Sequence, residues 1–351
     1  MTKRYSEFDY IRTIAALAVI VIHVTSLYVY QSKFMLVANQ FARFAVPIFI
    51  LISGLLLYLS DSGRNLSNFF TKRIKKICIP FVFWTIFYLI FNNSIDLKSG
   101  KGMFLNFFGL VFKGLVYGNA YVHLYFITII LQCYIIYPII KYLLNRWQCW
   151  TLCISFGITL LYQVGIYFMQ MGKIGFSWSP LPCYEFLPTW LFYFVLGMFI
   201  AKNILKIKEY IQGKSFLLGI IWSTTLLLLL IDSKLTKIYD SIRPSVMLYC
   251  ITTFFFLYSL LIGQNLQMKK ISDFIRWVSL QSFIIYLSHL YFMKLIIDNY
   301  PKLVTSTYGN PIFCGMFLFL GTVFSTLLFV FLISKTPLSS ILGGVTSKIR
   351  V

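Results

Sequence analysis

Apolar runs of membrane-spanning length recur along this chain of 351 residues and constrain its fold more than any other feature. Each run holds about 18 to 25 residues, which is long enough for a helix to cross a hydrocarbon core of about 30 Å. Within lipid, only helices and closed barrels satisfy their own backbone hydrogen bonds, and these runs are too long and continuous for barrel strands. The sequence therefore predicts an all-α integral membrane protein.

The pattern divides the chain into ten predicted spans. They lie at roughly 9–30, 42–60, 77–93, 121–140, 148–169, 186–202, 215–232, 244–264, 278–297 and 310–334. The stretch 103–118 is also apolar but holds a lysine and three glycines, so we interpret it as a re-entrant or interfacial segment. Because the loops are short and no repeat interrupts the spans, we expect residues 1–351 to form a single multi-span domain.

Charged residues make up only 12% of the chain, about half of what a soluble protein carries. The formal net charge of +21 would suggest a nucleic-acid partner in a soluble protein, but here the basic residues fill short loops. If the N-terminus is cytoplasmic, most of them fall on the cytoplasmic side, most densely in the block 64–76. We therefore predict cytoplasmic termini, contact with an anionic bilayer and no nucleic-acid partner.

Two further sequence features exclude other classes. The first apolar run is too long for a signal peptide and has no small-residue cleavage site after it, so we expect no cleavable signal. The seven cysteines are scattered through apolar runs without a CxxC pair. They are typical of buried apolar residues rather than of metal ligands or a disulfide framework, and we predict no metal site.

The first span, DYIRTIAALAVIVIH from Asp9 to His23, carries three ionisable residues that a simple anchor does not need. On a helix, Arg12 and His23 are separated by about 20° more than three full turns and by about 16 Å along the axis, so they share a face. Asp9 lies on that face too. The alternative is that Arg12 extends to the interface and His23 is a hydrogen-bonded structural residue.

The chain has only three histidines, and each falls within a predicted span. By the predicted topology, His23, His123 and His289 lie at a similar depth in the outer half of the membrane. We expect them to form one shared site, although three separate structural histidines remain the alternative.

These residues carry a resemblance to a known family. The chain resembles the bacterial acyltransferase family 3, integral membrane enzymes that O-acylate extracytoplasmic glycans with cytoplasmic acyl-CoA. The resemblance covers nearly the whole chain and includes a ten-span core. The residues that carry it are Asp9, Arg12 and His23 of the first span and the motifs PIFILISGLLLY (47–58), FFTKRIKKICIPF (69–81), HLYFI at His123, FVLGM (194–198) and YLSHL (286–290).

The resemblance implies a stand-alone enzyme of the bacterial cytoplasmic membrane, without the esterase-like domain fused to some members. Its donor would be acyl-CoA, with acetyl-CoA expected, and its acceptor a hydroxyl of a surface or lipid-linked polysaccharide. The phosphates of CoA would bind Arg12, Arg73, Lys75 and Lys76. The family usually has two arginines three residues apart where this chain has Arg73 and Lys76, and lysine lacks the planar fork of arginine. The alternative is that the basic block only sets topology.

The resemblance also implies roles for the residues of the first two spans. His23 would be the general base, kept neutral because an apolar environment disfavours its charged form. Asp9 and Arg12 complete the predicted catalytic set. Since Asp9 lies about 21 Å from His23 along the helix, we expect it to pair with Arg12. Ser53 and Gly54 would contact the CoA arm, or else form a helix-packing pair.

The acceptor side is assigned to three residues. His123 and His289 would position the acceptor or stabilise the developing oxyanion, although His289 could be structural. Glu185 would orient a histidine or bind sugar hydroxyls, with a plain interfacial carboxylate as the alternative. The competing function is a polysaccharide exporter or lipid-linked glycan flippase, because polar residues within spans also suit transporters. A homo-oligomer is compatible with the sequence.

Overall fold

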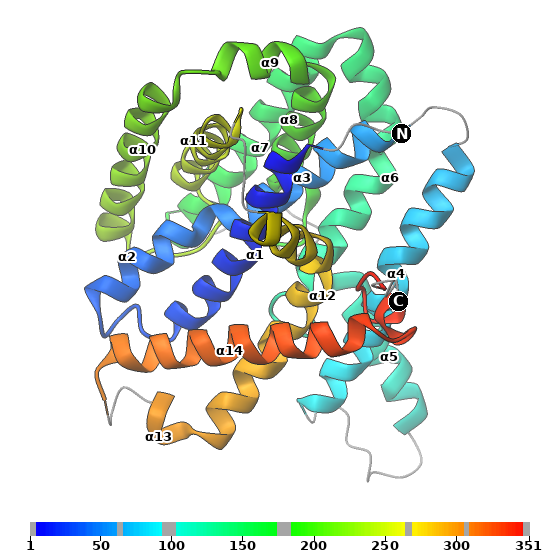
Figure 1. The fold of residues 1–351 in the computed structure, drawn as a ribbon, viewed down its shortest axis with the longest axis vertical. Coiled ribbons are helices and arrows are strands. Elements are labelled where there is room, and N and C mark those ends of the chain that lie inside the picture. Colours follow the sequence, from blue (N-terminus) through cyan, green and yellow to red (C-terminus); the bar gives the residue numbers. More distant parts are fainter. Residues whose placement is uncertain are drawn as a thin grey trace.

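The computed structural model of the chain describes residues 5–61, 66–92, 103–173, 184–263, 269–304 and 309–346. Every regular element in these ranges is a helix (Figure 1). The helices are α1 (Ser6–Ser26), α2 (Lys33–Phe41), the 3₁₀ helix η1 (Ala42–Phe44), α3 (Ala45–Ser60), α4 (Leu66–Phe91), α5 (Met103–Tyr117), α6 (Tyr125–Arg146), α7 (Gln148–Gln170), the 3₁₀ helix η2 (Leu187–Thr189), α8 (Leu191–Lys202), α9 (Ile204–Ile211), α10 (Ser215–Thr236), α11 (Pro244–Leu261), α12 (Lys269–Asn299), α13 (Pro301–Val304), α14 (Pro311–Ser334) and α15 (Leu338–Ile341).

Nine segments of the described chain are long and apolar enough to cross a membrane. They are α1, the continuous stretch α2–η1–α3, most of α4, and α6, α7, α10, α11, α12 and α14. The predicted all-α membrane fold is thus confirmed. The ends of two predicted spans, at 93 and 264, and residues 64 and 65 of the basic block lie outside the described residues.

The predicted span 186–202 differs from the other nine. Its helix, α8, has twelve residues and is therefore about 18 Å long, which is shorter than a hydrocarbon core. The segment before α8 is the 3₁₀ helix η2, and polar side chains of α7 bond its carbonyls: Thr159 Oγ1 donates to Pro188 O at 2.8 Å, and Gln163 Nε2 donates to Thr189 O at 3.1 Å. Backbone outside α-helices is tolerated within a membrane protein where protein groups satisfy its hydrogen bonds, as these two side chains do here.

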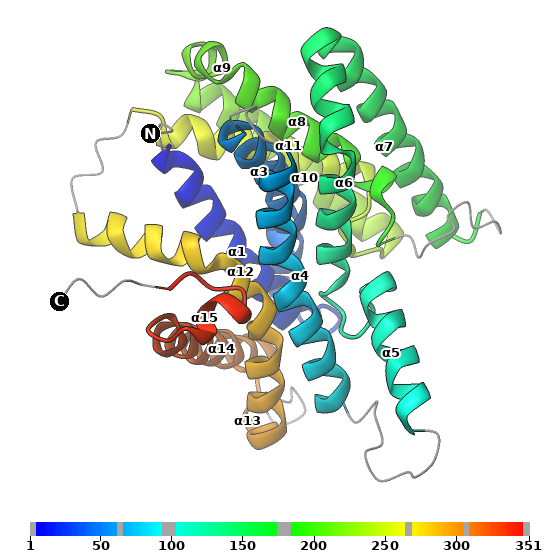
Figure 2. The same ribbon diagram turned by 90° about the vertical axis from the view of Figure 1, so that its right-hand side faces the viewer.

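The stretch 103–118 forms the helix α5, fifteen residues long and also shorter than a full span. It packs against α4 and α6 at one flank of the molecule (Figure 2). Its interpretation as a re-entrant or interfacial segment stays a prediction.

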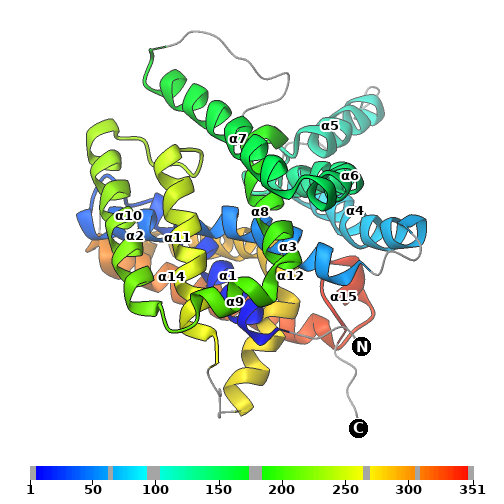
Figure 3. The same cartoon turned by 90° about the horizontal axis from the view of Figure 1, so that it is seen from above.

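Helix α1 lies at the centre of the bundle, among α3, α11, α12 and α14 (Figures 1 and 3). Its buried alanines, Ala15, Ala16 and Ala18, let neighbouring helices approach closely. Helix α14 runs crosswise to α10 in Figure 1 and packs along α12. Most residues of α1 are therefore buried by protein, the location expected for ionisable residues within a membrane.

Helices α3 and α8 cross with their backbones in contact. A Cβ atom on Gly197 would lie 2.9 Å from Leu51 C and would overlap Leu51 O, and a Cβ atom on Gly54 would overlap Phe194 O. Small residues at such crossings let two backbones touch. Of the two predicted roles for Gly54, the structure supports helix packing.

Candidate functional site

Helix α1 is continuous from Ser6 to Ser26, so it holds Arg12 and His23 at the predicted separation of about 16 Å. The acidic residues in its first turn stabilise the helix because they lie at the positive end of its dipole. In its last turn, Thr25 Oγ1 donates to Val21 O and Ser26 Oγ donates to Ile22 O, each at 2.6 Å. These side-chain hydroxyls compete with backbone N–H groups for the helix carbonyls, which is consistent with the helix ending at Ser26.

The structure brings the three histidines together. The ring centroids of His23 and His289 are 5.3 Å apart, and those of His123 and His289 are 5.4 Å apart. His123 precedes α6 in a turn, while His289 lies in α12, so three separate elements supply the cluster. His123 and His289 are fully buried, and His23 is half-buried.

Backbone carbonyls fix the tautomers of the two buried histidines. A carbonyl can only accept, so His289 Nδ1 carries the proton donated to Tyr286 O at 2.7 Å, and His123 Nε2 carries the proton donated to Leu287 O at 3.2 Å. The other nitrogens, His289 Nε2 and His123 Nδ1, have no hydrogen-bond partner among the described residues. In the neutral rings these nitrogens are therefore proton acceptors, available to a bound molecule.

A cavity of about 180 Å³ holds most of the predicted donor-side residues. Its polar wall includes Arg12, Ser53, Arg73 and Lys76. Arg73 Nη2 donates to Ser60 Oγ at 2.6 Å, and Ser53 Oγ donates to Phe49 O at 2.8 Å. We call this the basic cavity.

Lys75 does not line the basic cavity and is exposed on α4. Arg73, Lys76 and Ile77 line the cavity and share one face of α4, and at about 100° per residue Lys75 falls on the opposite face. Only Lys76 of these two lysines is placed to meet a molecule in the cavity.

The basic cavity ends at an aromatic wall made by Phe49, Phe126 and Tyr286. Along α6 it reaches from Tyr134 to Phe126, a distance of about 12 Å for eight helical residues. The ring centroid of Tyr286 lies 5.2 Å from that of His123 and 6.0 Å from that of His289. The cavity therefore links the basic side chains to the histidine cluster through one tyrosine.

The two predicted carboxylates lie apart from the histidine cluster in their described contacts. Asp9 accepts a hydrogen bond from Ser279 Oγ at 2.8 Å, and its pairing with Arg12 stays a prediction. Glu185 is buried next to the N-terminal half of α6, where Gln132 Nε2 donates to its backbone oxygen at 2.6 Å. Its Oε2 has no partner among the described residues, and burial raises the pKa of this carboxyl.

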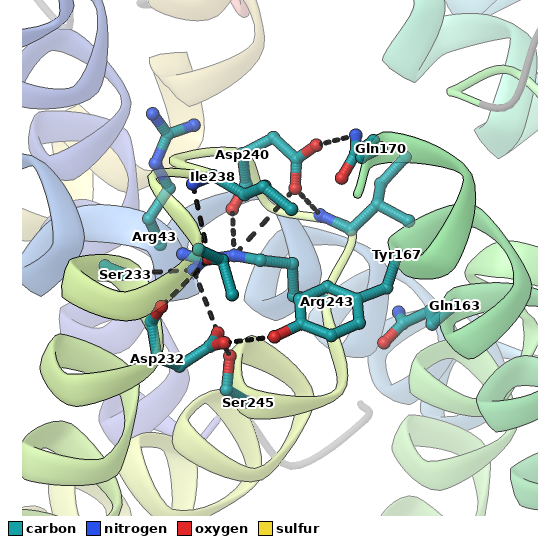
Figure 4. Close-up of polar contacts among 12 residues, drawn as sticks. Arg43, Gln163, Tyr167, Gln170, Asp232, Ser233, Ile238, Asp240, Arg243 and Ser245 are labelled. Atoms are coloured by element: carbon teal, nitrogen blue, oxygen red, sulfur yellow. Dashed lines mark hydrogen bonds and ion pairs between the residues drawn. The ribbon is translucent and has the colours of Figure 1, made fainter. Parts of the chain in front are cut away.

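The sequence reasoning missed a buried arginine between α10 and α11. Arg243 is fully buried, and its Nη1 donates to Asp232 Oδ2 at 3.0 Å and to Ser233 Oγ at 3.1 Å (Figure 4). Asp240 lies 4.0 Å from its Nε. Its Nη2 donates to Gln40 Oε1 in α2. Two carboxylates thus neutralise this guanidinium.

The same network continues from α2 to α1. Gln40 Nε2 donates to Asn39 Oδ1 at 3.1 Å, and Arg43 Nε donates to the same oxygen at 3.0 Å. Asn39 Nδ2 in turn donates to Ile22 O at 3.1 Å and to Thr25 Oγ1 at 2.9 Å, both in the turn of α1 that carries His23. The sequence signal for these residues is their polarity at the start of an otherwise apolar run.

A family model described as an acyltransferase domain matches residues 5–335 of the chain. The chain is 28% identical over 324 residues to the "Putative membrane-bound acyltransferase YfiQ" of Bacillus subtilis, covering 85% of this chain and 84% of that protein. It is 25% identical over 226 residues to the "Probable poly-beta-1,6-N-acetyl-D-glucosamine export protein" of Staphylococcus aureus, covering 60% of this chain and 61% of that protein. No solved structure matches the chain.

Proposed function

The chain belongs to the family defined by this acyltransferase domain, and we propose that it transfers an acyl group, with acetyl as the expected one, from acyl-CoA to a hydroxyl of a surface or lipid-linked polysaccharide. Membership makes it a membrane O-acyltransferase; the donor, the acyl group and the acceptor are our proposal. The proposed setting is a bacterial cytoplasmic membrane, with both termini inside and the histidine cluster in the outer half.

The observation that carries the proposal is the basic cavity and its aromatic end beside the histidines. Arg12, Arg73 and Lys76 offer positive charge for the phosphates of CoA, and the two arginines can each present a planar fork of donors. The pantetheine arm is a long, thin chain that suits a cavity lined mainly by apolar side chains. The thioester would then lie towards Tyr286 and the histidine cluster.

His23 is proposed as the general base. The acceptor hydroxyl gives its proton to the imidazole as its oxygen attacks the thioester carbonyl carbon. The carbon–sulfur bond then breaks, the proton passes to the departing thiolate, and the products are an ester and CoA. A positioned base contributes about 10²–10⁴-fold to such a reaction.

The second candidate function is polysaccharide export, which the name of the staphylococcal relatives favours. An exporter needs a continuous polar path for a glycan chain, but it does not need a basic cavity joined to three histidines. Both functions act on a surface glycan, but they change different properties of it. Acyl transfer changes the ester content of the glycan, whereas export changes the amount of glycan at the surface.

The test compares surface glycan from cells with the wild-type protein, a His23→Ala variant and an Arg146→Gln control on the exposed end of α6. Base-labile ester content and mass spectrometry report acylation, and the amount of glycan reports export. We expect His23→Ala to remove the ester and leave the amount of glycan unchanged. Unchanged ester content in a well-expressed His23→Ala variant would contradict acyl transfer, and loss of an otherwise normal glycan would favour export.

A further inference from the structure

Two arginines belong to the hydrogen-bond network that joins α2 to α11, and they differ in charge compensation. Arg243 has Asp232 at 3.0 Å and Asp240 at 4.0 Å. Arg43, in η1, has no carboxylate within 4.0 Å in the part of the chain that the structure describes. Asp240 is the main negative charge that acts on Arg43, but it lies beyond ion-pair distance. Desolvating a half-buried guanidinium without a carboxylate in contact is costly, so a bound anion would stabilise it.

Asn39 holds the Arg43 side chain in a defined position. Its Oδ1 accepts from Arg43 Nε at 3.0 Å and from Arg43 Nη2 at 2.6 Å. A guanidinium has five N–H donors, so three of them have no partner among the described residues. Asn39 is fully buried and also bonded to α1, which makes the position of these donors depend on the protein rather than on the solvent.

Arg43 is connected to the turn of α1 that carries His23, and it lies outside the basic cavity proposed for the acyl donor. Asn39 bonds Ile22 O, one residue before His23, and Arg43 bonds the same Asn39 side chain. Arg43 does not line the basic cavity. The first residue of α3 that does so is Phe49, about 9 Å further along the chain at 1.5 Å per residue.

We propose that Arg43 is an anion-binding side chain on the acceptor side of His23, and that it binds a phosphate or carboxylate group carried by the acceptor. The three remaining N–H donors suit two-point contact with either oxyanion. Binding there would hold an acceptor hydroxyl close to the imidazole. The acceptor in this statement rests on the proposed function; the anion site itself does not.

The first test measures anion binding without catalysis. Purified full-length protein is saturated with CoA, so that the basic cavity is occupied, and is then titrated with inorganic phosphate or with acetate while its thermal unfolding is followed. We expect phosphate to raise the unfolding temperature of the wild type and of the Arg146→Gln control. Arg43→Gln should weaken the apparent affinity at least ten-fold, and Arg43→Lys, which keeps the charge without the fork, by less.

Two outcomes of this titration would overturn the proposal. One is the lack of any anion-dependent shift in the wild type with CoA bound. The other is a wild-type affinity of Arg43→Gln for every anion tested. If the glutamine variant does not fold, a wild-type affinity of Arg43→Lys for every anion tested overturns the proposal instead. Acetate and phosphate titrations report separately which oxyanion the site prefers.

The second test measures acyl transfer to paired acceptors, the same sugar with and without a phosphate or carboxylate substituent. Arg43→Gln should raise KM at least ten-fold for the charged sugar and leave KM for the neutral sugar unchanged. An equal fall in kcat for both sugars would place Arg43 at the transition state and overturn the anion site. If the wild type acylates neither sugar, the proposed function fails, while the phosphate titration still decides the role of Arg43.

Discussion

Replacing Gly197 with alanine tests how closely α3 and α8 must pack to build the basic cavity. The added Cβ would lie 2.9 Å from both Leu51 C and Leu55 N, whereas ordinary contact begins at 3.4 Å. The two backbones would have to separate by about 0.5 Å or more, and close-packed interiors resist such a shift. Overpacking of this kind costs about 1–3 kcal/mol, so Gly197→Ala should lower the free energy of unfolding by that amount.

The matched control is Gly157→Ala in α7, where an added Cβ meets nothing within 4 Å. Alanine at such a helical position should raise the free energy of unfolding by about 0.4–1 kcal/mol. Both variants are purified in mild detergent, and their unfolding midpoints are compared with that of the wild type. Equal stability of the two variants would refute the close α3–α8 crossing. Because α3 also carries Ser53, Gly197→Ala should in addition weaken acyl-CoA binding.

Three more predictions follow from named contacts. Arg73→Gln should raise KM for acyl-CoA about ten-fold or more because a charge-assisted contact is lost. Lys75→Gln, outside the basic cavity, should leave this KM unchanged in steady-state assays. Equal effects of the two substitutions on KM would contradict the placement of the cavity. Arg243→Gln should destabilise the protein by about 3–5 kcal/mol because it leaves buried charge unpaired, and a wild-type unfolding midpoint would count against the network. Burial raises the pKa of Glu185, so the folded state binds more protons than the unfolded one above the ordinary carboxyl pKa of about 4.3. The free energy of unfolding of the wild type relative to Glu185→Gln should therefore fall as pH rises from about 4.3 through the raised pKa of Glu185. The same pH dependence of unfolding in both proteins would refute the raised pKa.

The helices were largely predictable from sequence because length and hydropathy are local properties. The exception, α8, depends on side chains of another helix: Thr159 and Gln163 satisfy the turn that shortens it. A continuous apolar run cannot reveal such a turn, although Pro188 within the run is a local signal for it.

The candidate site was predictable in part. Three histidines in apolar runs are rare enough that a shared location was the expected outcome, and the ring distances around His289 agree with it. Their tautomers could not be predicted, because the carbonyls of Tyr286 and Leu287 define them only after folding. The roles of the three histidines remain proposals.

The polar network could not be predicted because its members are distant in sequence. Gln40 and Arg243 are joined by a hydrogen bond across 203 positions, and neither residue belongs to a periodic pattern. Likewise, sequence alone gave no reason to separate Lys75 from Lys76. Their difference depends on how α4 is rotated against α3 and α6.

Acyl transfer by protein reconstituted in vesicles is the direct test of His23 as the general base of a transmembrane acyltransferase. Acyl-CoA with a labelled acyl group is supplied on one side and a saccharide acceptor on the other, and labelled ester is measured for wild type, His23→Ala and Arg146→Gln. We expect label on the acceptor for wild type and control, and a rate about 10²–10⁴-fold lower for His23→Ala. Transfer by His23→Ala at the wild-type rate would contradict it.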